Sequence, residues 1–167
     1  ALYAEAIRTY LDQRRRPNRT PGSWAGRFEL HESEEDAISS DPDIVAEYIT
    51  YPSPNGHGQV RGYRVRPAKA TGKLPGVVVV HENRGLNPHI EDITRRLALD
   101  GFMAFAPDAL TPLGGYPGDE AKARAAFATL DQSKTRAAFL LSVKWLRARP
   151  DGSGKLGAVG FCYGGGI

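Results

Sequence analysis

The sequence predicts an α/β fold built on a doubly wound, mostly parallel sheet. Segments with strand character alternate with segments of helical periodicity between residues 75 and 161. Residues 77–80 are four consecutive valines, and a continuous β-branched run is typical of a strand buried on both faces of a parallel sheet. In such a fold the functional loops follow the carboxyl ends of the strands.

Two parts are expected in the chain. Residues 1–43 form an N-terminal extension, in which residues 2–15 carry an apolar stripe at helical spacing and a proline-containing loop follows. No chemistry is visible in this extension. Residues 44–167 form the first part of the α/β domain.

Strands are predicted where apolar and β-branched residues cluster, at residues 45–51, 60–66, 77–80, 102–107 and 156–161. The first two are separated by a short turn rich in glycine and proline, so they should form an antiparallel hairpin. Helices are predicted from a cap at Asn87 to Gly101, over residues 119–130, and from a cap at Ser133. In the last helix the expected core face consists of Phe139, Leu140, Val143 and Leu146.

The charge balance argues against a nucleic-acid-binding protein. The chain has 22 basic and 19 acidic side chains, and the arginines of residues 1–27 are followed by an acidic stretch rather than interleaved with aromatic residues. No run of ~20 apolar residues and no secretory signal is visible, and a single cysteine fits a reducing compartment. We therefore expect a cytoplasmic protein with neither a nucleic-acid nor a membrane partner.

Residues 160–164 read Gly-Phe-Cys-Tyr-Gly, which is the pattern of a nucleophile elbow with cysteine as the nucleophile. Glycines are needed at the two outer positions because side chains there would clash with the sharp strand-to-helix turn. The alternative is a buried, inert cysteine, which is the ordinary state of an isolated Cys. The position of Cys162 at a predicted strand end favours the elbow.

Polar residues follow two other strands at their carboxyl ends. Glu82 and Arg84 come after the valine run, and Asp108 follows the next strand. Glu82 is expected to line the site rather than to be an ordinary surface carboxylate, and Arg84 is the local candidate for binding an anionic substrate group. Asp108 either lines the site or caps its loop. No spacing of His, Cys, Asp and Glu indicates a metal, and no cofactor is expected.

With these strand ends in place, the chain resembles the dienelactone hydrolase family of α/β-hydrolases. The resemblance covers residues ~45 to 167 and rests on residues 75–87, 101–110 and 160–165. It implies that Cys162 is the nucleophile and that Glu82 exchanges partners with its thiol and helps to form the thiolate. The backbone N–H groups of Asn83 and Tyr163 would form the oxyanion hole, in agreement with the donor pattern of an elbow.

Two departures from the family pattern affect what can be expected. Archetypal members carry an arginine for the substrate carboxylate shortly after the second motif, whereas this chain has Thr111, Pro112 and Leu113 there. The family's aspartate and histidine lie beyond the elbow. The four histidines of this chain all precede Cys162, so none is expected to be the catalytic base; they are His31, His57, His81 and His89.

The predicted function is hydrolysis of small esters or lactones through Cys162. We expect the chain to be the N-terminal portion of a longer domain, completed by a C-terminal piece that supplies aspartate and histidine. Without that piece, a catalytically incomplete fragment is the alternative. A Rossmann-like nucleotide-binding protein is the weaker alternative, because the terminal glycines do not give G-x-G-x-x-G.

Overall fold

Five strands form one sheet in the order β1-β2-β4-β3-β5. The computed structural model describes residues 41–167, so the predicted helix at 2–15 and nearly all of the predicted extension lie outside the described residues. The strands are β1 (Ile44–Ser53), β2 (Gly58–Pro67), β3 (Leu74–Val80), β4 (Met103–Pro107) and β5 (Gly152–Gly160). The helices are α3 (Pro88–Leu99), α4 (Glu120–Ala128) and α5 (Gln132–Arg147), with short 3₁₀ turns η1 (Thr111–Leu113) and η2 (Cys162–Gly166).

The sheet is mixed. Strands β1 and β2 form the antiparallel hairpin that the sequence predicts, and β2 also pairs antiparallel with β4. Strand β3 pairs in parallel with β4 on one side and with β5 on the other. The carboxyl ends of these three parallel strands therefore meet at one end of the sheet, which is the end expected to carry the site.

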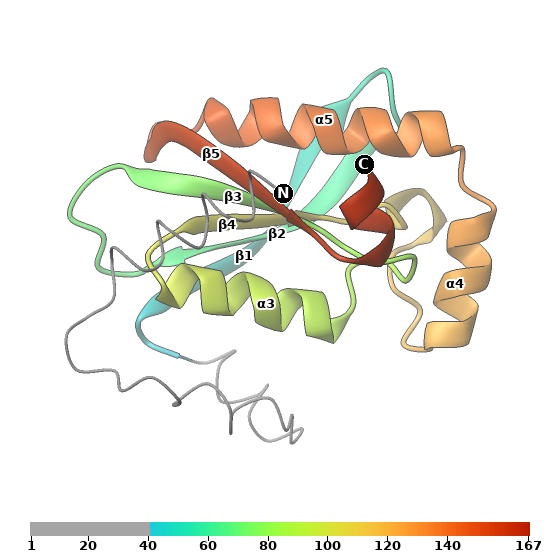
Figure 1. Cartoon of the computed structure of the whole chain (residues 1–167), viewed down its shortest axis with the longest axis horizontal. Coiled ribbons are helices and arrows are strands. Elements are labelled where there is room, and N and C mark those ends of the chain that lie inside the picture. The colour runs from blue at the N-terminus through green and yellow to red at the C-terminus, as the bar shows by residue number, and fades with distance from the viewer. Residues whose placement is uncertain (1–40) are drawn as a thin grey trace. The chain divides into compact units, whose positions relative to one another are not determined.

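Helices cover both faces of the sheet, as a doubly wound fold requires (Figure 1). Helix α3 lies on one face, and α5 lies on the other. The alternation of β3 explains how both faces are filled, because Val78 and Val80 join the cluster beneath α5 whereas Val79 joins the cluster beneath α3. The valine run is thus buried on both sides, as predicted.

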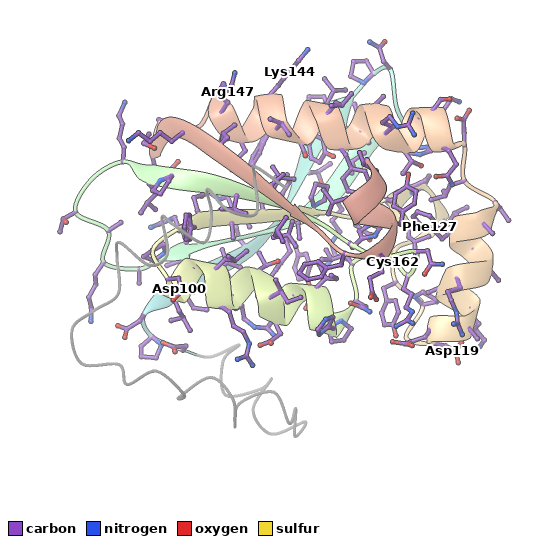
Figure 2. The ribbon with its side chains drawn as sticks, in the orientation of Figure 1. Asp100, Asp119, Phe127, Lys144, Arg147 and Cys162 are labelled. Carbon is purple, nitrogen blue, oxygen red and sulfur yellow. The ribbon has the colours of Figure 1, made fainter. Side chains whose placement is uncertain are left out.

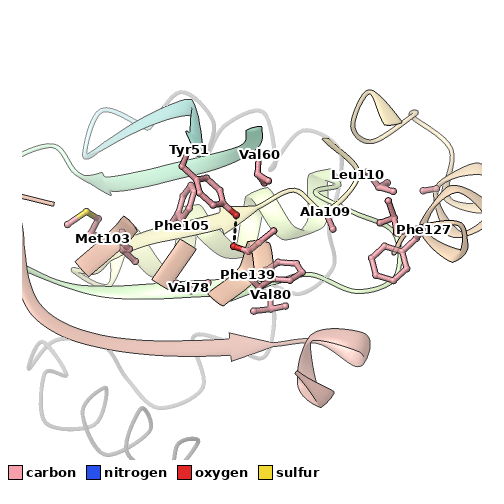
Figure 3. Close-up of a cluster of buried hydrophobic side chains, with 14 residues drawn as sticks. Tyr51, Val60, Val78, Val80, Met103, Phe105, Ala109, Leu110, Phe127 and Phe139 are labelled. Carbon is pink, nitrogen blue, oxygen red and sulfur yellow. Dashed lines mark hydrogen bonds between the residues drawn. The ribbon is translucent and has the colours of Figure 1, made fainter. Parts of the chain in front are cut away.

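The cluster beneath α5 is the larger of the two and contains most of the aromatic core (Figure 3). Tyr51 packs edge-to-face on Phe105 with ring centroids 5.7 Å apart. Its hydroxyl donates a hydrogen bond of 2.9 Å to the carbonyl of Ala138 in α5. This bond gives the fully buried phenol a polar partner and ties the first hairpin to the helix.

The helix ends agree with the predictions for α3 but not for α5. Asn87 caps α3 by accepting a hydrogen bond from the N–H of Ile90. The cap of α5 is Asp131 rather than Ser133, because the Asp131 carboxylate accepts hydrogen bonds from the N–H groups of Ser133 and Lys134.

The core face of α5 also differs from the prediction. Phe139 and Leu146 are buried, but Leu140 is 59% exposed. Leu140 lies about 100° around the helix from Phe139, and the buried stripe runs instead through Thr135, Ala138 and Ser142. No helix in residues 41–167 has the length and apolar character needed to cross a membrane.

Candidate active site

Cys162 lies two residues after the end of β5 and has the backbone conformation of a nucleophile elbow. Its φ is +52°, and it is the only non-glycine residue with positive φ in residues 41–167. This left-handed conformation costs roughly 1–2 kcal/mol for an L-residue and persists only where the surrounding structure enforces it. The thiol is exposed, so the buried, inert state of an isolated cysteine does not apply.

The glycines on either side of the turn explain what enforces it. A Cβ atom on Gly160 would lie 2.0 Å from the carbonyl oxygen of Gly164, and one on Gly164 would lie 2.3 Å from the carbonyl oxygen of Val80. Both distances are far below van der Waals contact. The chain therefore folds back on itself and onto β3 too closely for any side chain, as the elbow pattern predicts.

Strands β3 and β5 carry Glu82 and Cys162 to the same end of the sheet. Val80 pairs with Gly160, and the N–H of Phe161 donates a hydrogen bond of 3.1 Å to the carbonyl of Val80. Glu82 and Cys162 each come two residues after this pair, on neighbouring parallel strands. Glu82 is partly exposed, in agreement with a position at the edge of the site rather than in the core.

Arg84 lies between two carboxylates. Its Nη1 atom is 3.4 Å from Glu82 and 3.2 Å from Glu120, which belongs to the first turn of α4. The two residues that flank Asn83 in the sequence therefore form an ion pair with each other. The contact with α4 spans 36 residues of sequence.

His81 holds the ends of β3 and β4 together on the side of the sheet that α5 covers. Its Nε2 accepts a hydrogen bond of 3.1 Å from the N–H of Ala109, so Nδ1 carries the proton and donates it to the carbonyl of Glu82. The ring is fully buried, between Phe127 and Phe139. Burial lowers the pKa of His81 from 6.5 to about 4, which keeps the imidazole neutral. These contacts give His81 a structural position at the end of β3.

Asp108 caps the loop after β4. One carboxylate oxygen accepts hydrogen bonds from the N–H groups of Leu86 and Leu110, and the residue is almost fully buried. Burial raises the pKa of this carboxyl, whereas the two hydrogen bonds oppose the increase. Of the two roles considered for Asp108, the geometry favours loop capping.

Helix α4 touches both sides of the candidate site. Its first turn reaches Arg84 through Glu120, and Phe127 in its last turn packs edge-to-face on Tyr163 with ring centroids 4.7 Å apart. Figure 2 shows Cys162 and Phe127 at the end of the sheet that faces α4. Burial against the helix raises the pKa of Tyr163. The backbone N–H of Tyr163, the proposed oxyanion donor, thus belongs to a residue whose ring is fixed by packing.

The remaining described histidines lie outside this arrangement. His57 in the first hairpin turn contacts the hydroxyl of Thr135, at 3.1 Å. His89 is exposed in the first turn of α3, with its ring 6.5 Å from that of Phe161. No hydrogen bond joins a histidine to Cys162 within residues 41–167, and His31 lies outside the described residues. Thr111, Pro112 and Leu113 form η1, where Thr111 bonds to the backbone of Asp108 and Arg61.

The whole of this arrangement lies in the segment that matches a known family. The family model described as "Dienelactone hydrolase family" matches residues 60–167. The chain belongs to the dienelactone hydrolase family. The segment matched includes the strand ends that carry Glu82, Asp108 and Cys162, and it excludes β1 and everything before it.

Relatives and solved structures agree with the family assignment. The chain is similar to a candidate hydrolase fragment of Escherichia coli (strain K12), YghX, with 69% identity over 51% of this chain and 73% of the relative. It is 35% identical to a candidate carboxymethylenebutenolidase of the same strain, over 76% of this chain and 47% of the relative. The chain also matches a crystal structure of a candidate dienelactone hydrolase from Klebsiella pneumoniae, with 32% identity and a TM-score of 0.58. The aligned part covers 73% of this chain and 51% of the Klebsiella chain. The α/β-hydrolase fold is thereby shown, and the chain spans about half the length of the last two proteins.

Sequence reasoning missed two residues beside the site, Glu120 and Phe127. Both belong to a helix that was predicted, but nothing in the pattern of α4 indicates that its two ends reach Arg84 and Tyr163. These contacts join residues 36 positions apart, and only the packing of α4 beyond the strand ends creates them.

Proposed function

We propose that the protein is a hydrolase that cleaves small esters or lactones through Cys162. The observation that carries this proposal is the exposed thiol at φ +52°, on a turn that two glycines close against β3. Such a turn costs free energy, and it is typical of a nucleophile lifted above the end of a sheet. Family membership supports the same reaction class.

In the proposed reaction the thiolate of Cys162 attacks the carbonyl carbon of the ester. The electron pair of the C=O bond moves to oxygen, where the N–H groups of Asn83 and Tyr163 would stabilise the negative charge. Collapse of this intermediate breaks the bond to the alcohol oxygen, which leaves after taking up a proton. Water then attacks the thioester, releases the acid and restores the thiol. Glu82, two residues after the end of β3, is proposed to help to form the thiolate.

We also propose that a C-terminal segment of the same domain supplies the aspartate and the histidine. Strand β5 pairs with β3 along one edge, and no strand in residues 41–167 pairs with its other edge. A strand added there would cover the exposed main-chain groups of β5 and would bring further residues to the end of the sheet. The relatives quoted at 47% and 51% coverage are about twice as long as the segment they share with this chain.

A catalytically incomplete fragment is the second candidate function. The absence of a histidine hydrogen-bonded to Cys162 in residues 41–167 favours it. Removal of one member of a catalytic triad commonly lowers kcat by several orders of magnitude. The two candidates make different predictions for turnover by the 167-residue chain alone.

The test combines the mass of the native assembly with the hydrolysis of p-nitrophenyl acetate. Turnover should depend on a second polypeptide or segment, should stop after alkylation with iodoacetamide, and should be absent in Cys162→Ala. A 167-residue monomer without turnover supports the incomplete fragment. Turnover that survives in Cys162→Ala overturns the assignment of the nucleophile.

A further inference from the structure

Arg84 is shared between two carboxylates at the same end of the sheet as the proposed nucleophile. Its Nη1 atom lies 3.4 Å from Glu82 and 3.2 Å from Glu120, and all three side chains are partly exposed. The group carries one positive and two negative formal charges. Its Nε atom is buried and has no hydrogen-bond partner within residues 41–167, so the two carboxylates hold the guanidinium through Nη1.

The position of this group links it to the acyl part of a substrate. Asn83, whose N–H is a proposed oxyanion donor, lies between Glu82 and Arg84 in the sequence. Helix α4 carries Glu120 at one end, and at the other end it packs on Tyr163, the second proposed donor. An acyl group bound to Cys162 with its oxygen on these two donors would therefore lie on the side of the site where α4 packs, which is also the side of Arg84 and Glu120.

We propose that Glu120 determines whether the site accepts an ester whose acyl group is negatively charged. Glu120 acts as an internal anion for Arg84, so a substrate carboxylate would have to displace it and would still face Glu82. Esters with uncharged acyl groups are therefore favoured over esters whose acyl group carries a carboxylate. This inference rests on the proposed function in one respect, because it takes Cys162 as the reacting group.

The charge around Cys162 can be measured without hydrolysis. Iodoacetamide and iodoacetate are similar in size, and both lose iodide to the same thiolate, but only iodoacetate is anionic. The ratio of their rate constants cancels the fraction of thiolate and reports the local charge. Cys162 is the only cysteine of the chain, so intact mass follows a single reaction.

The experiment compares wild type with Glu120→Gln, Arg84→Gln and the double variant. We expect Glu120→Gln to raise the iodoacetate-to-iodoacetamide ratio about threefold, as one freed unit charge several ångströms away would. Arg84→Gln should lower the ratio. In the Arg84→Gln background the effect of Glu120→Gln should be clearly smaller, since no guanidinium is then released. The threefold gain should shrink in 1 M NaCl, where screening is strong.

Glu47→Gln is the matched control. Glu47 also forms a partly exposed ion pair, with Arg64 at 2.6 Å, but it lies on β1 at the opposite edge of the sheet from β5. Arg64 also contacts Asp151, before the start of β5, so this ion pair belongs to the far end of the strands. The ratio should not change in this variant. An equal change in Glu47→Gln and Glu120→Gln would overturn the proposal.

Two further outcomes would overturn it: an unchanged ratio in Glu120→Gln, or an equal gain with and without Arg84. Glu120 is 52% exposed at its side chain, so Glu120→Gln tests the proposal even if Arg84→Gln does not fold. Hydrolysis of p-nitrophenyl acetate against mono-p-nitrophenyl glutarate gives a second comparison. If neither ester is hydrolysed, the proposed function fails, while the alkylation ratio still decides the role of Glu120.

Discussion

The N–H of Phe161 donates a hydrogen bond of 3.1 Å to the carbonyl of Val80. This bond continues the β3–β5 ladder to the residue before Cys162. The same carbonyl oxygen would lie 2.3 Å from a Cβ atom on Gly164. One main-chain group of β3 thus fixes both the entry into the turn and the return of the chain after Cys162. The register of two strands, rather than any side chain, positions the thiol.

The closeness of this turn predicts a large effect of a single methyl group. Gly160→Ala would place Cβ 2.0 Å from the Gly164 carbonyl oxygen, so we expect a loss of more than about 2 kcal/mol in the free energy of unfolding, measured in urea. Gly166→Ala is the control, because a Cβ there meets no atom within 4 Å. Equal stability of the two variants would contradict the elbow geometry.

The positive φ of Cys162 predicts that glycine is better tolerated there than alanine. Both Cys162→Gly and Cys162→Ala remove the thiol, but only glycine adopts φ +52° without strain. We expect the glycine variant to be more stable than the alanine variant by about 1 kcal/mol in urea unfolding. Neither variant should hydrolyse esters. A more stable alanine variant would mean that the backbone relaxes out of this conformation.

His81 predicts a loss of stability in acid. Its pKa is about 4 when folded and 6.5 when exposed, so the unfolded chain binds more protons between these values. Stability should therefore fall as the pH decreases from 6.5 to 4, by roughly 3 kcal/mol at most, and no further below that. Asp108, with a raised pKa, contributes a slope of the opposite sign in the acid range.

Variants separate the contribution of His81 from that of Asp108. In His81→Gln the loss of stability between pH 6.5 and 4 should be smaller than in wild type, whatever its stability at neutral pH. Thermal or urea unfolding at several pH values measures both slopes. The same slope in His81→Gln and wild type would exclude this role of the imidazole.

The cap of α5 gives a test of structure against sequence pattern. Asp131→Ala removes the acceptor of two N–H groups and should clearly lower the urea concentration at the midpoint of unfolding. Ser133→Ala, at the position that the sequence pattern favours, should change this midpoint much less, because Ser133 is the first-turn donor and not the cap. A larger effect at Ser133 would reverse the assignment.

The sequence by itself determined the α/β class, the antiparallel first hairpin, the buried valine strand and the dienelactone hydrolase family. These features depend on local pattern: the turn that joins the hairpin, the β-branched run at residues 77–80, and the glycines at 160 and 164 that no other residue can replace. The alternation of strand side chains does not continue past Val80, because the ring of His81 packs on Phe139, in the same cluster as Val80.

The tertiary structure alone decided what surrounds the strand ends. It placed Glu120 in an ion pair with Arg84 and packed Phe127 on Tyr163. It also formed the hydrogen bonds from Ala109 to His81 and from Leu110 to Asp108. Leu140, in contrast, is exposed to solvent. The contacts of Glu120 and Phe127 depend on where α4 packs beyond the strand ends, the exposure of Leu140 depends on how α5 packs on the sheet, and the hydrogen bonds of His81 and Asp108 depend on how the loops after β3 and β4 meet. Such packing is fixed by many weak contacts between distant segments, and it leaves no periodic or spaced signal in the sequence.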